Sequence, residues 1–200
     1  MSGEIGGVWP VAGRVRRIYT RSGDQGQTRL LSGETLEKDD LRVNTYGTLD
    51  ELQSHLGMAR ALMSEPTLRS MLYAIQKDLF VAGSELASTP TKLARLKRRL
   101  TTEDVSVLEA KMDQLAETFG IPGSFVIPGA SSDSAALHVA RSVCRRVERL
   151  IVQLNRSARS YQGLIVYFNR LSDLLFVMAW SATVNALAES VLDELVARRK

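Results

Sequence analysis

The stretch SSDSAALHVARSVCRRVERLIVQLNR, residues 131–156, decides the fold, because its apolar side chains recur at helical spacing. The members of this apolar stripe are separated by three or four residues and are Leu137, Ala140, Cys144, Val147, Ile151 and Leu154. Such spacing places them on one face of an α-helix, and that face must be buried against other elements. Ser131 or Ser132 can cap the N-terminus. We therefore expect a long amphipathic helix at the centre of the protein.

The same stretch carries charged residues beside its apolar stripe. Arg146 points away from the stripe and can sit in water. Arg141 and Glu148 lie at the edge of the apolar face, where a charge needs a partner or an ionic ligand. Arg141, Arg145 and Arg149 follow one another at i, i+4 and i+8, so their guanidinium groups can line one ridge that suits phosphate oxygens. A solvated basic face with one internal Arg–Glu pair explains the same charges.

Composition predicts a single globular domain. The chain has 200 residues, of which 44% are apolar and 24% charged, and its net charge is +4; these values are ordinary for a soluble protein with one core. Aromatic residues make up only 6%, which argues against a general nucleic-acid binder. No apolar run reaches the roughly 18 residues of a membrane span, and the N-terminus lacks a secretory pattern, so we expect a cytoplasmic protein.

No resident metal site is expected from the cysteine and histidine residues. Cys144 is the only cysteine, which excludes an internal disulfide and a multi-cysteine zinc site. Its place on the apolar stripe predicts a buried, inert thiol. His55 and His138 do not have the spacing of metal ligands, and packing or surface roles are expected for both.

The N-terminal region differs from the rest of the chain. Residues 1–16 contain several glycines and a proline and are expected to form a flexible extension, before a single domain at residues 17–198. The turn from Gly23 to Gly26 can point successive backbone N–H groups inward as an anion-binding nest. It lacks the lysine and hydroxyl residue of a P-loop, and a plain surface turn remains the alternative.

Four further helices are predicted around the central one, at about residues 44–63, 67–87, 101–119 and 163–198. With almost no strand signal, the pattern indicates an all-α, five-helix up-and-down bundle with an irregular N-terminal arm. The stretch at 88–100, whose cations include Arg95, Lys97, Arg98 and Arg99, is expected to be a solvated surface connection. The last helix is apolar on nearly every side through Met178, yet Asn169, Arg170 and Asp173 interrupt it, which marks an internal network or a ligand site.

Six separated motifs occur in one order along the chain. They are YTRSGDQGQT at 19–28, KDD at 38–40, YGTLDEL at 46–52, FVIPG at 125–129, ALHVARSVCRRVER at 136–149 and FNRLSDLLF at 168–176. Together they resemble the ATP:corrinoid adenosyltransferases of the propanediol-utilisation type, the family of the human mitochondrial enzyme of cobalamin metabolism. The resemblance implies a ferritin-like helical bundle that forms a homotrimer with active sites at subunit interfaces.

The resemblance also implies an activity: the 5′-deoxyadenosyl group of ATP is transferred to cob(I)alamin, and tripolyphosphate is released. ATP and the reduced corrinoid are the implied substrates, with Mg²⁺ on the phosphates. A reductase and an adenosylcobalamin-dependent enzyme are possible protein partners, and neither nucleic acid nor a membrane is expected. A corrinoid carrier or sensor that binds ATP without turnover, and a structural helical oligomer, remain the alternative functions.

By resemblance, particular residues take particular roles. Those of the nucleotide-binding arm are Thr20, Arg21, Ser22, Gly23, Thr28 and Lys38. Those that contact ATP from the helical body are Arg145, Arg146, Glu148, Arg149 and Asn169. Those assigned to catalysis are Arg145, Asp50, Arg141 and Phe125; the pair Asp50 and Arg141 is expected to bridge subunits.

Two aromatic residues are implied for the corrinoid. Phe125 matches the residue that displaces the lower axial ligand of cobalt, and Phe176 matches a second residue near the corrin ring. The sequence departs from the family pattern at Ser32 and Ala130, where the family has glycine, and at Trp180, where it has arginine. These departures leave the ATP motifs intact and concern the corrinoid pocket and the packing of the C-terminal helix.

Overall fold

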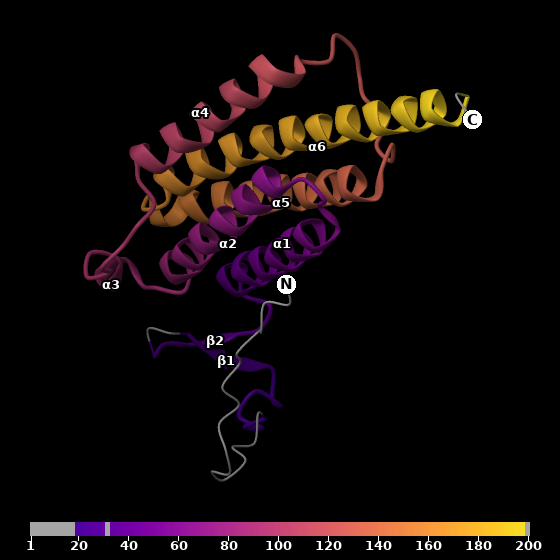
Figure 1. Cartoon of the computed structure of the whole chain (residues 1–200). Helices are drawn as coiled ribbons and strands as arrows, with labels where there is room; N and C mark the ends of the chain where they lie inside the picture. The colour runs from indigo at the N-terminus through magenta and orange to yellow at the C-terminus, as the bar shows by residue number, and fades with distance from the viewer. Residues whose placement is uncertain (1–18, 31–32, 199–200) are drawn as a thin grey trace, which may run out of the picture.

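The computed structural model describes residues 19–30 and 33–198, and this part of the chain is an all-α bundle, as predicted (Figure 1). The long helices are α1 (Leu41–Leu62), α2 (Pro66–Leu86), α4 (Thr102–Phe119), α5 (Ser132–Ala158) and α6 (Gln162–Ala197). A short helix α3 (Pro90–Leu93) follows α2, and the strands β1 (Gln27–Arg29) and β2 (Thr35–Glu37) precede α1. The expected flexible extension at 1–16 and the departure at Ser32 lie outside the described residues.

Helix α5 occupies the centre of the bundle, because it packs against both α1 and α6. Helix α2 covers α1 and helix α4 covers α6. The predicted stripe of α5 is buried along its whole length, from Leu137 to Leu154. Cys144 lies within it, and burial raises the pKa of its thiol far above the ordinary value. The apolar periodicity of the sequence therefore predicted both the central helix and its buried face.

Side-chain caps set several helix ends. The Asp40 carboxylate accepts from the backbone N–H of Arg42 at 2.7 Å, so α1 begins three residues before the predicted start at 44. Thr101 and Asp104 form the expected capping box of α4. Ser131 is the N-cap of α5, and its hydroxyl accepts from the backbone N–H of Ser134.

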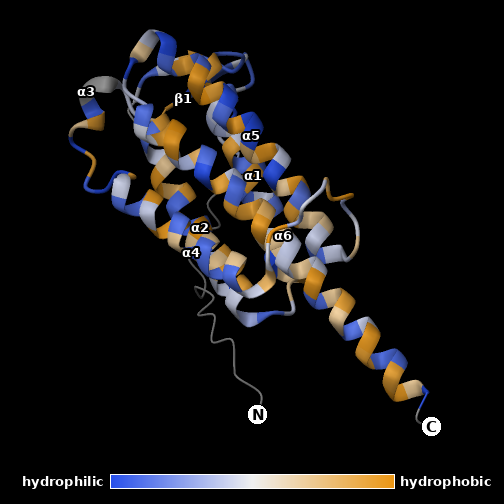
Figure 2. Ribbon diagram, turned by 90° about the horizontal axis from the view of Figure 1, so that it is seen from above, coloured by the Kyte–Doolittle hydropathy of each residue, from blue (hydrophilic) through white to orange (hydrophobic). Residues whose placement is uncertain are grey.

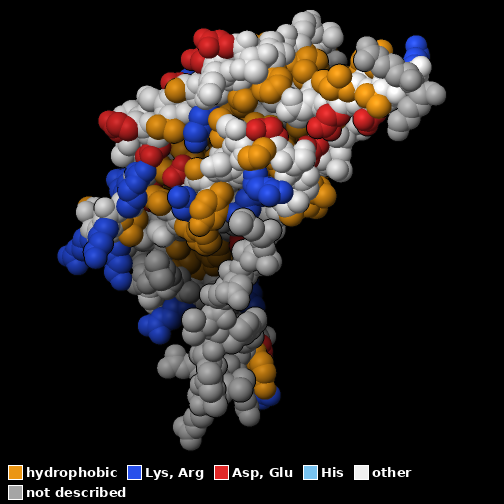
Figure 3. Space-filling model, in the orientation of Figure 1, with side chains coloured by type: hydrophobic (Ala, Val, Ile, Leu, Met, Phe, Trp, Pro, Cys, Tyr) orange, Lys and Arg blue, Asp and Glu red, His pale blue; other side chains and the backbone are white. Residues whose placement is uncertain are grey.

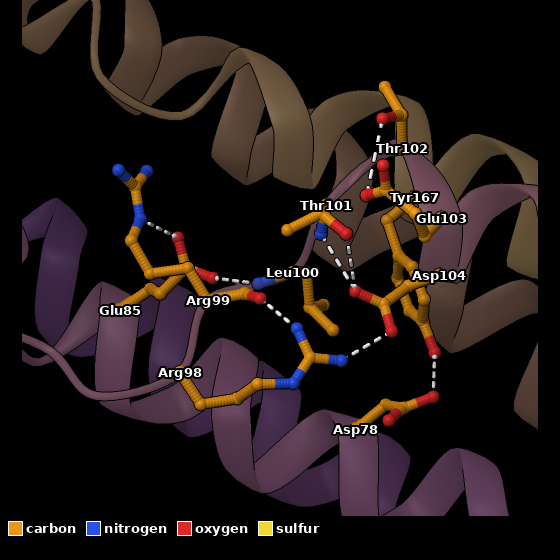
Figure 4. A network of polar contacts seen from close by, with 10 residues as sticks. All are labelled: Asp78, Glu85, Arg98, Arg99, Leu100, Thr101, Thr102, Glu103, Asp104 and Tyr167. Atoms are coloured by element: carbon orange, nitrogen blue, oxygen red, sulfur yellow. Dashed lines mark hydrogen bonds and ion pairs between the residues drawn. The ribbon is translucent and has the colours of Figure 1, made fainter.

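The connection between α2 and α4 is not simply solvated, which corrects the expectation for residues 88–100 (Figure 4). Glu85 is only 1% exposed, and its carboxylate accepts from the Leu100 N–H at 2.8 Å and from Arg99 Nε at 3.1 Å. Arg98 pairs with Asp104 at the start of α4. Two of the cations in this stretch are thus held by carboxylates that lie too far away in sequence for a local pattern to reveal.

The arm before α1 contains an antiparallel hairpin that the sequence did not predict. Strands β1 and β2 are three residues each and pair Thr28 with Leu36. Gly26 has φ of +87°, a left-handed conformation that favours glycine. Figure 1 shows the hairpin below the helical body, beside the start of α1. Most side chains of the described arm are exposed, whereas Leu30, directly after β1, is buried.

Helix α6 is the one helix in the described part of the chain whose length and hydropathy would allow a membrane span. Between Leu164 and Ala182 its buried side chains recur at every turn of the helix and pack in the bundle. A core helix passes the same test of length and hydropathy. Beyond these residues α6 leaves the bundle and projects from it (Figure 2).

Candidate active site

The glycine turn and Lys38 lie together in the arm. The Lys38 backbone N–H donates to the Gly26 carbonyl at 2.7 Å. A Cβ atom on Gly23 would lie 3.2 Å from Lys38 Nζ and 3.2 Å from the Gln27 carbonyl oxygen. The absence of a side chain at Gly23 therefore lets the ammonium group approach the backbone of the turn. This is a cationic turn of the kind that accepts phosphate oxygens.

Further donors surround this turn. The hydroxyls of Thr20 and Ser22 are 2.8 Å apart. Arg21 has φ of +61°, and its guanidinium carbon lies 5.6 Å from the centroid of the Tyr19 ring. Thr28, on β1, is half-buried. The arm residues named from the sequence thus belong to one continuous segment rich in hydrogen-bond donors.

A second cationic site lies on α5, where Arg145, Glu148 and Arg149 line a hollow of about 380 Å³. Arg145 and Arg149 are exposed, so their guanidinium groups are available to a ligand. Arg156 completes the hollow, and sequence reasoning missed it. Its position seven residues after Arg149, on the same face of the helix, was the signal that could have identified it.

Asn169 of α6 joins this hollow through hydrogen bonds. Its Nδ2 donates to Glu148 Oε1 at 3.2 Å, and its Oδ1 accepts from Arg170 Nη1 at 2.9 Å. Arg170 Nε donates in turn to Glu109 Oε1 of α4 at 2.7 Å. Asn169 and Arg170, two of the polar residues that interrupt α6, therefore belong to a network that orients Glu148 at the edge of the hollow, whereas Asp173, the third, is exposed and lies outside it. Glu109 could not be assigned to this network from the sequence, because the two helices are brought together only by the fold.

Arg146 points elsewhere. It forms an ion pair with Glu51 of α1, and both side chains are nearly half exposed. These two residues line a separate hollow of about 520 Å³, together with Arg141 and His138. The ridge predicted from i, i+4 and i+8 spacing is therefore divided: Arg145 lies in the cationic hollow, whereas Arg141 does not.

An aromatic hollow of about 690 Å³ contains the two residues expected to meet the corrinoid, Phe125 and Phe176. Arg141 and His138 also line it. Phe125 is fully exposed on the loop before α5, whereas Phe176 is half-buried, with its ring centroid 6.1 Å from that of His138. Burial, and the charge of Arg141, lower the pKa of His138. His138 is a buried member of the hollow, with an unpartnered imidazole, that sequence spacing alone did not single out.

Asp50 and Arg141 do not meet within one chain. Asp50 is exposed in a hollow between α1 and α2, where Phe80 is also exposed. Arg141 lies on α5, and its Nε is buried without a hydrogen-bond partner. Neither side chain takes part in an ion pair among residues 19–30 and 33–198. Both groups are therefore available for contacts outside the single chain.

Trp180, one of the departures from the family pattern, has a structural role. Its indole Nε1 donates to the Phe119 carbonyl at 3.2 Å. This bond fastens the C-terminal end of α4 to α6. Ala130 is exposed in the loop before α5, next to Gly129, whose φ is +115°.

The arm and the two hollows together define a class of protein: a helical bundle that carries cationic side chains in the arm and on α5, and a separate hollow lined by aromatic rings. The profile of one family, described as cobalamin adenosyltransferase, matches residues 18–182. The chain is 48% identical to a corrinoid adenosyltransferase of Citrobacter freundii over 82% of its own length and 93% of that protein. It is 34% identical to the human corrinoid adenosyltransferase over 83% of its length and 68% of that protein.

Solved structures agree with this relationship. A variant of the PduO-type ATP:corrinoid adenosyltransferase from Lactobacillus reuteri, complexed with cobalamin and ATP, matches with a TM-score of 0.77 and 38% identity, covering 84% of this chain and 91% of that one. The chain therefore belongs to the cobalamin adenosyltransferase family, and it is a transferase.

Proposed function

We propose that this chain transfers the 5′-deoxyadenosyl group of ATP to the reduced cobalt of a corrinoid, forming adenosylcobalamin. The observation that carries the proposal is the arrangement on α5. Arg141 lines the aromatic hollow, and Arg145, four residues on, lines the cationic hollow. Four residues of helix are about 6 Å. A corrinoid in the first hollow and a triphosphate in the second would therefore be neighbours.

The reaction needs no nucleophilic side chain, because the substrate cobalt is the nucleophile. Co(I) donates an electron pair to C5′ of ATP, the Co–C bond forms, and the bond between C5′ and the phosphate oxygen breaks. Cobalt is formally oxidised to Co(III), and tripolyphosphate departs with the electron pair of the broken bond. The protein must place the two reactants in line, which can contribute roughly 7–11 kcal/mol, and must stabilise the departing anion.

The cationic side chains would perform the second task. Lys38, held against Gly23, would neutralise phosphate charge from the arm, while Arg145 and Arg149 would do so from α5. Glu148, oriented by Asn169, would accept hydrogen bonds from the sugar or base rather than face the phosphates. This division follows from charge, since a carboxylate near the triphosphate would oppose the reaction.

Mg²⁺ would enter with the nucleotide. Within the described ranges, no three His, Cys, Asp or Glu side chains gather into a possible metal site. An ion held mainly by phosphate oxygens suits this inventory, since Mg²⁺ in nucleotide sites takes most of its ligands from phosphate and water. It would add positive charge at the departing group.

Phe125 would act on the corrinoid. Its ring is free in the described chain, at the mouth of the aromatic hollow. An apolar ring against the lower face of the corrin would exclude both water and the lower axial base, which favours the four-coordinate Co(I) state. Phe176 would support the ring system from α6.

The complete site would form between subunits of a homotrimer. The bonds from Thr20 to Ser22, from Gln27 to Glu37 and from Arg29 to Gly33 stay within the arm. Glu34 reaches α1, where it pairs with Arg42 at 3.2 Å. The arm projects from the bundle (Figure 1), so an adjacent subunit is the natural place for its donors to meet a cationic hollow. Asp50 and Arg141, which do not meet within the chain, would join the subunits.

The cell compartment and further partners are part of the same proposal. A cytoplasmic enzyme would need a reductase to supply Co(I), and its product would serve an adenosylcobalamin-dependent enzyme. Neither a nucleic acid nor a membrane is required by any step.

A spectral assay tests the function. Purified protein is mixed with ATP and chemically reduced cobalamin under anaerobic conditions, and formation of the light-sensitive Co–C bond is followed by absorbance. Catalytic appearance of adenosylcobalamin, with stoichiometric tripolyphosphate, is expected. Binding of both substrates without product would instead identify the carrier or sensor, and no binding of either would leave a structural oligomer.

A further inference from the structure

The end of α6 extends past the part of the chain that matches the family. The family profile ends at residue 182, and the Thr183 hydroxyl, 2.8 Å from that of Ser134, makes the last side-chain bond of α6 to the bundle among the described residues. Residues 184–197 continue the helix beyond this point. Asn185, Ala186 and Glu189 still line a hollow with the α1–α2 connection and the start of α5, and the remainder projects from the bundle (Figure 2). We call this segment the α6 extension.

The α6 extension is amphipathic and leaves large apolar side chains in solvent. The side chains that are between 54% and 61% exposed are Leu187, Val191, Leu192, Leu195 and Val196. Most of them recur at three or four residues, so they form a stripe along one side of the helix. Such a contiguous apolar surface on a soluble protein marks an interaction site.

Acidic residues border this stripe. Glu189, Asp193 and Glu194 are all exposed. Within residues 19–30 and 33–198, Glu194 alone of the three has an ion pair, a weak one to Arg198 at 3.9 Å. Figure 3 shows hydrophobic and acidic side chains together toward the end of α6. The surface that receives the extension should therefore be apolar with cations at its border.

The outer face of α1 and α2 has that chemistry. Tyr73 and Phe80, seven residues apart on α2, are 54% and 70% exposed. Two cations flank Tyr73: the Arg60 guanidinium carbon and Lys77 Nζ each lie 5.1 Å from its ring centroid. Phe80 also lines a groove of about 420 Å³ between the two helices. Gly47 and other small residues line the same groove. Small residues let another helix approach closely.

We propose that the α6 extension of one copy docks along the α1–α2 face of a second copy. The apolar stripe covers Tyr73 and Phe80, and the acidic border meets Arg60 and Lys77. The stripe from Leu187 to Leu195 spans about 12 Å and the two aromatic rings are separated by about 10 Å along α2, at 1.5 Å per residue. The lengths of the two surfaces therefore correspond.

The proposed contact is continuous with the pairing of Asp50 and Arg141. Asp50 lies in the same groove as Phe80. In the copy that supplies the extension, Arg141 lies on α5, whose N-terminal end is bonded to α6 through Ser134 and Thr183. Arg141 is seven residues, or about 10 Å of helix, from Ser134, so a neighbour that places Arg141 at Asp50 would bring the start of its α6 extension close to the same face. The extension would thus add to the same subunit interface without contributing to the chemistry.

Cross-linking tests the contact directly. Chains with Val191→Cys are mixed with chains carrying Lys77→Cys, under mild oxidation; the native Cys144 is buried and does not interfere. A disulfide-linked pair of unlike chains is expected. A matched control, Glu117→Cys, at an exposed position of α4, should not link to Val191→Cys. Equal linking to the control, or linking of Val191→Cys only to itself, would overturn the proposal.

Charge reversal provides a second test. Reversing Asp193 and Glu194 to lysine should weaken self-association, measured by sedimentation, roughly tenfold for two exposed ion pairs. Reversing Arg60 and Lys77 to glutamate in the same chain should restore it to within about twofold. Undiminished association of the first variant, or no recovery in the second, would refute the docking. Adenosyl transfer assayed in parallel separates this outcome from failure of the proposed function.

Discussion

Substitution of Asp50 or Arg141 should disrupt assembly and catalysis together. Arg141 Nε is buried without a partner in the single chain, and Asp50 stands on a different face of the same subunit. If a neighbouring Asp50 satisfies Arg141, removing either leaves the other charge desolvated. The loss for a buried pair is roughly 3–5 kcal/mol per interface, which corresponds to about two to three and a half orders of magnitude in association.

The experiment is a double-mutant cycle. Asp50→Asn, Arg141→Ala and the double variant are compared with the parent by sedimentation equilibrium and by initial rates of adenosyl transfer. We expect each single change to weaken the trimer, and the double change to cost much less than the sum of the single costs. Simple additivity would refute the pairing and return both charges to a solvated helix face.

Glu51→Gln is the matched control. Glu51 is adjacent to Asp50 on α1, but its ion pair is with Arg146 of the same chain, and both side chains are nearly half exposed. Exposed pairs contribute about 0–1 kcal/mol. This variant should therefore assemble like the parent protein, so a comparable loss would show that α1 tolerates no change of charge in this region.

Other predictions concern the site and the core. Arg145→Ala and Lys38→Ala should each slow adenosyl transfer at least about tenfold, from loss of a charge-assisted contact of about 1.5–3 kcal/mol, with unchanged circular dichroism; normal kinetics would place the side chain away from the phosphates. Hydrogen exchange at residues 19–40 should slow when ATP is added, and Gly23→Ala, whose new Cβ would meet Lys38 Nζ at 3.2 Å, should reduce that protection. Burial, and the charge of Arg141, lower the pKa of His138 in the folded protein. The imidazole of the unfolded chain therefore takes up a proton at a higher pH than that of the folded chain. The free energy of unfolding should fall as the pH drops below about 6.5, the ordinary pKa of histidine. Thermal melts of His138→Asn should show a smaller decline over that range, and an equal decline would exclude His138 as its source. Tyr167→Phe removes a hydrogen bond of 3.0 Å to a carboxylate on α2, and urea unfolding should show a loss of about 1–3 kcal/mol.

The helices could be predicted because their determinants are local. The stripe of α5 repeats at three and four residues, and the capping box at Thr101 and Asp104 lies within four residues of sequence. The hairpin at Thr28 and Leu36 could not be found in this way. Its strands are three residues each, with no sustained apolar alternation, and a cross-strand bond from Gln27 Nε2 to Glu37 Oε1 at 2.7 Å helps to hold it.

The sequence motifs assign expected roles to single residues, but they do not give the geometry that joins those residues. Family motifs identified Glu148 and Asn169 separately, and only the fold shows that they share a hydrogen bond. His138 belongs to the aromatic hollow because α6 brings Phe176 beside it, a contact 38 positions apart in the chain. Periodicity assigns a residue to a face, whereas the partner of that face depends on how the helices are packed.

Helix geometry explains why the arginine ridge predicted from the spacing is divided between two hollows. Positions i, i+4 and i+8 drift around an α-helix by about 40° per step, because 3.6 residues complete a turn. Over two steps this drift moves Arg149 away from Arg141, so one end of the row can face an apolar hollow while the other faces a cationic one. Under the proposed function this drift would be useful: a single helix would present a different surface to each substrate and would keep the corrinoid and the nucleotide about one turn apart. Any change that bends α5 between Arg141 and Arg145 should therefore lower the rate of transfer more than it weakens binding of either substrate.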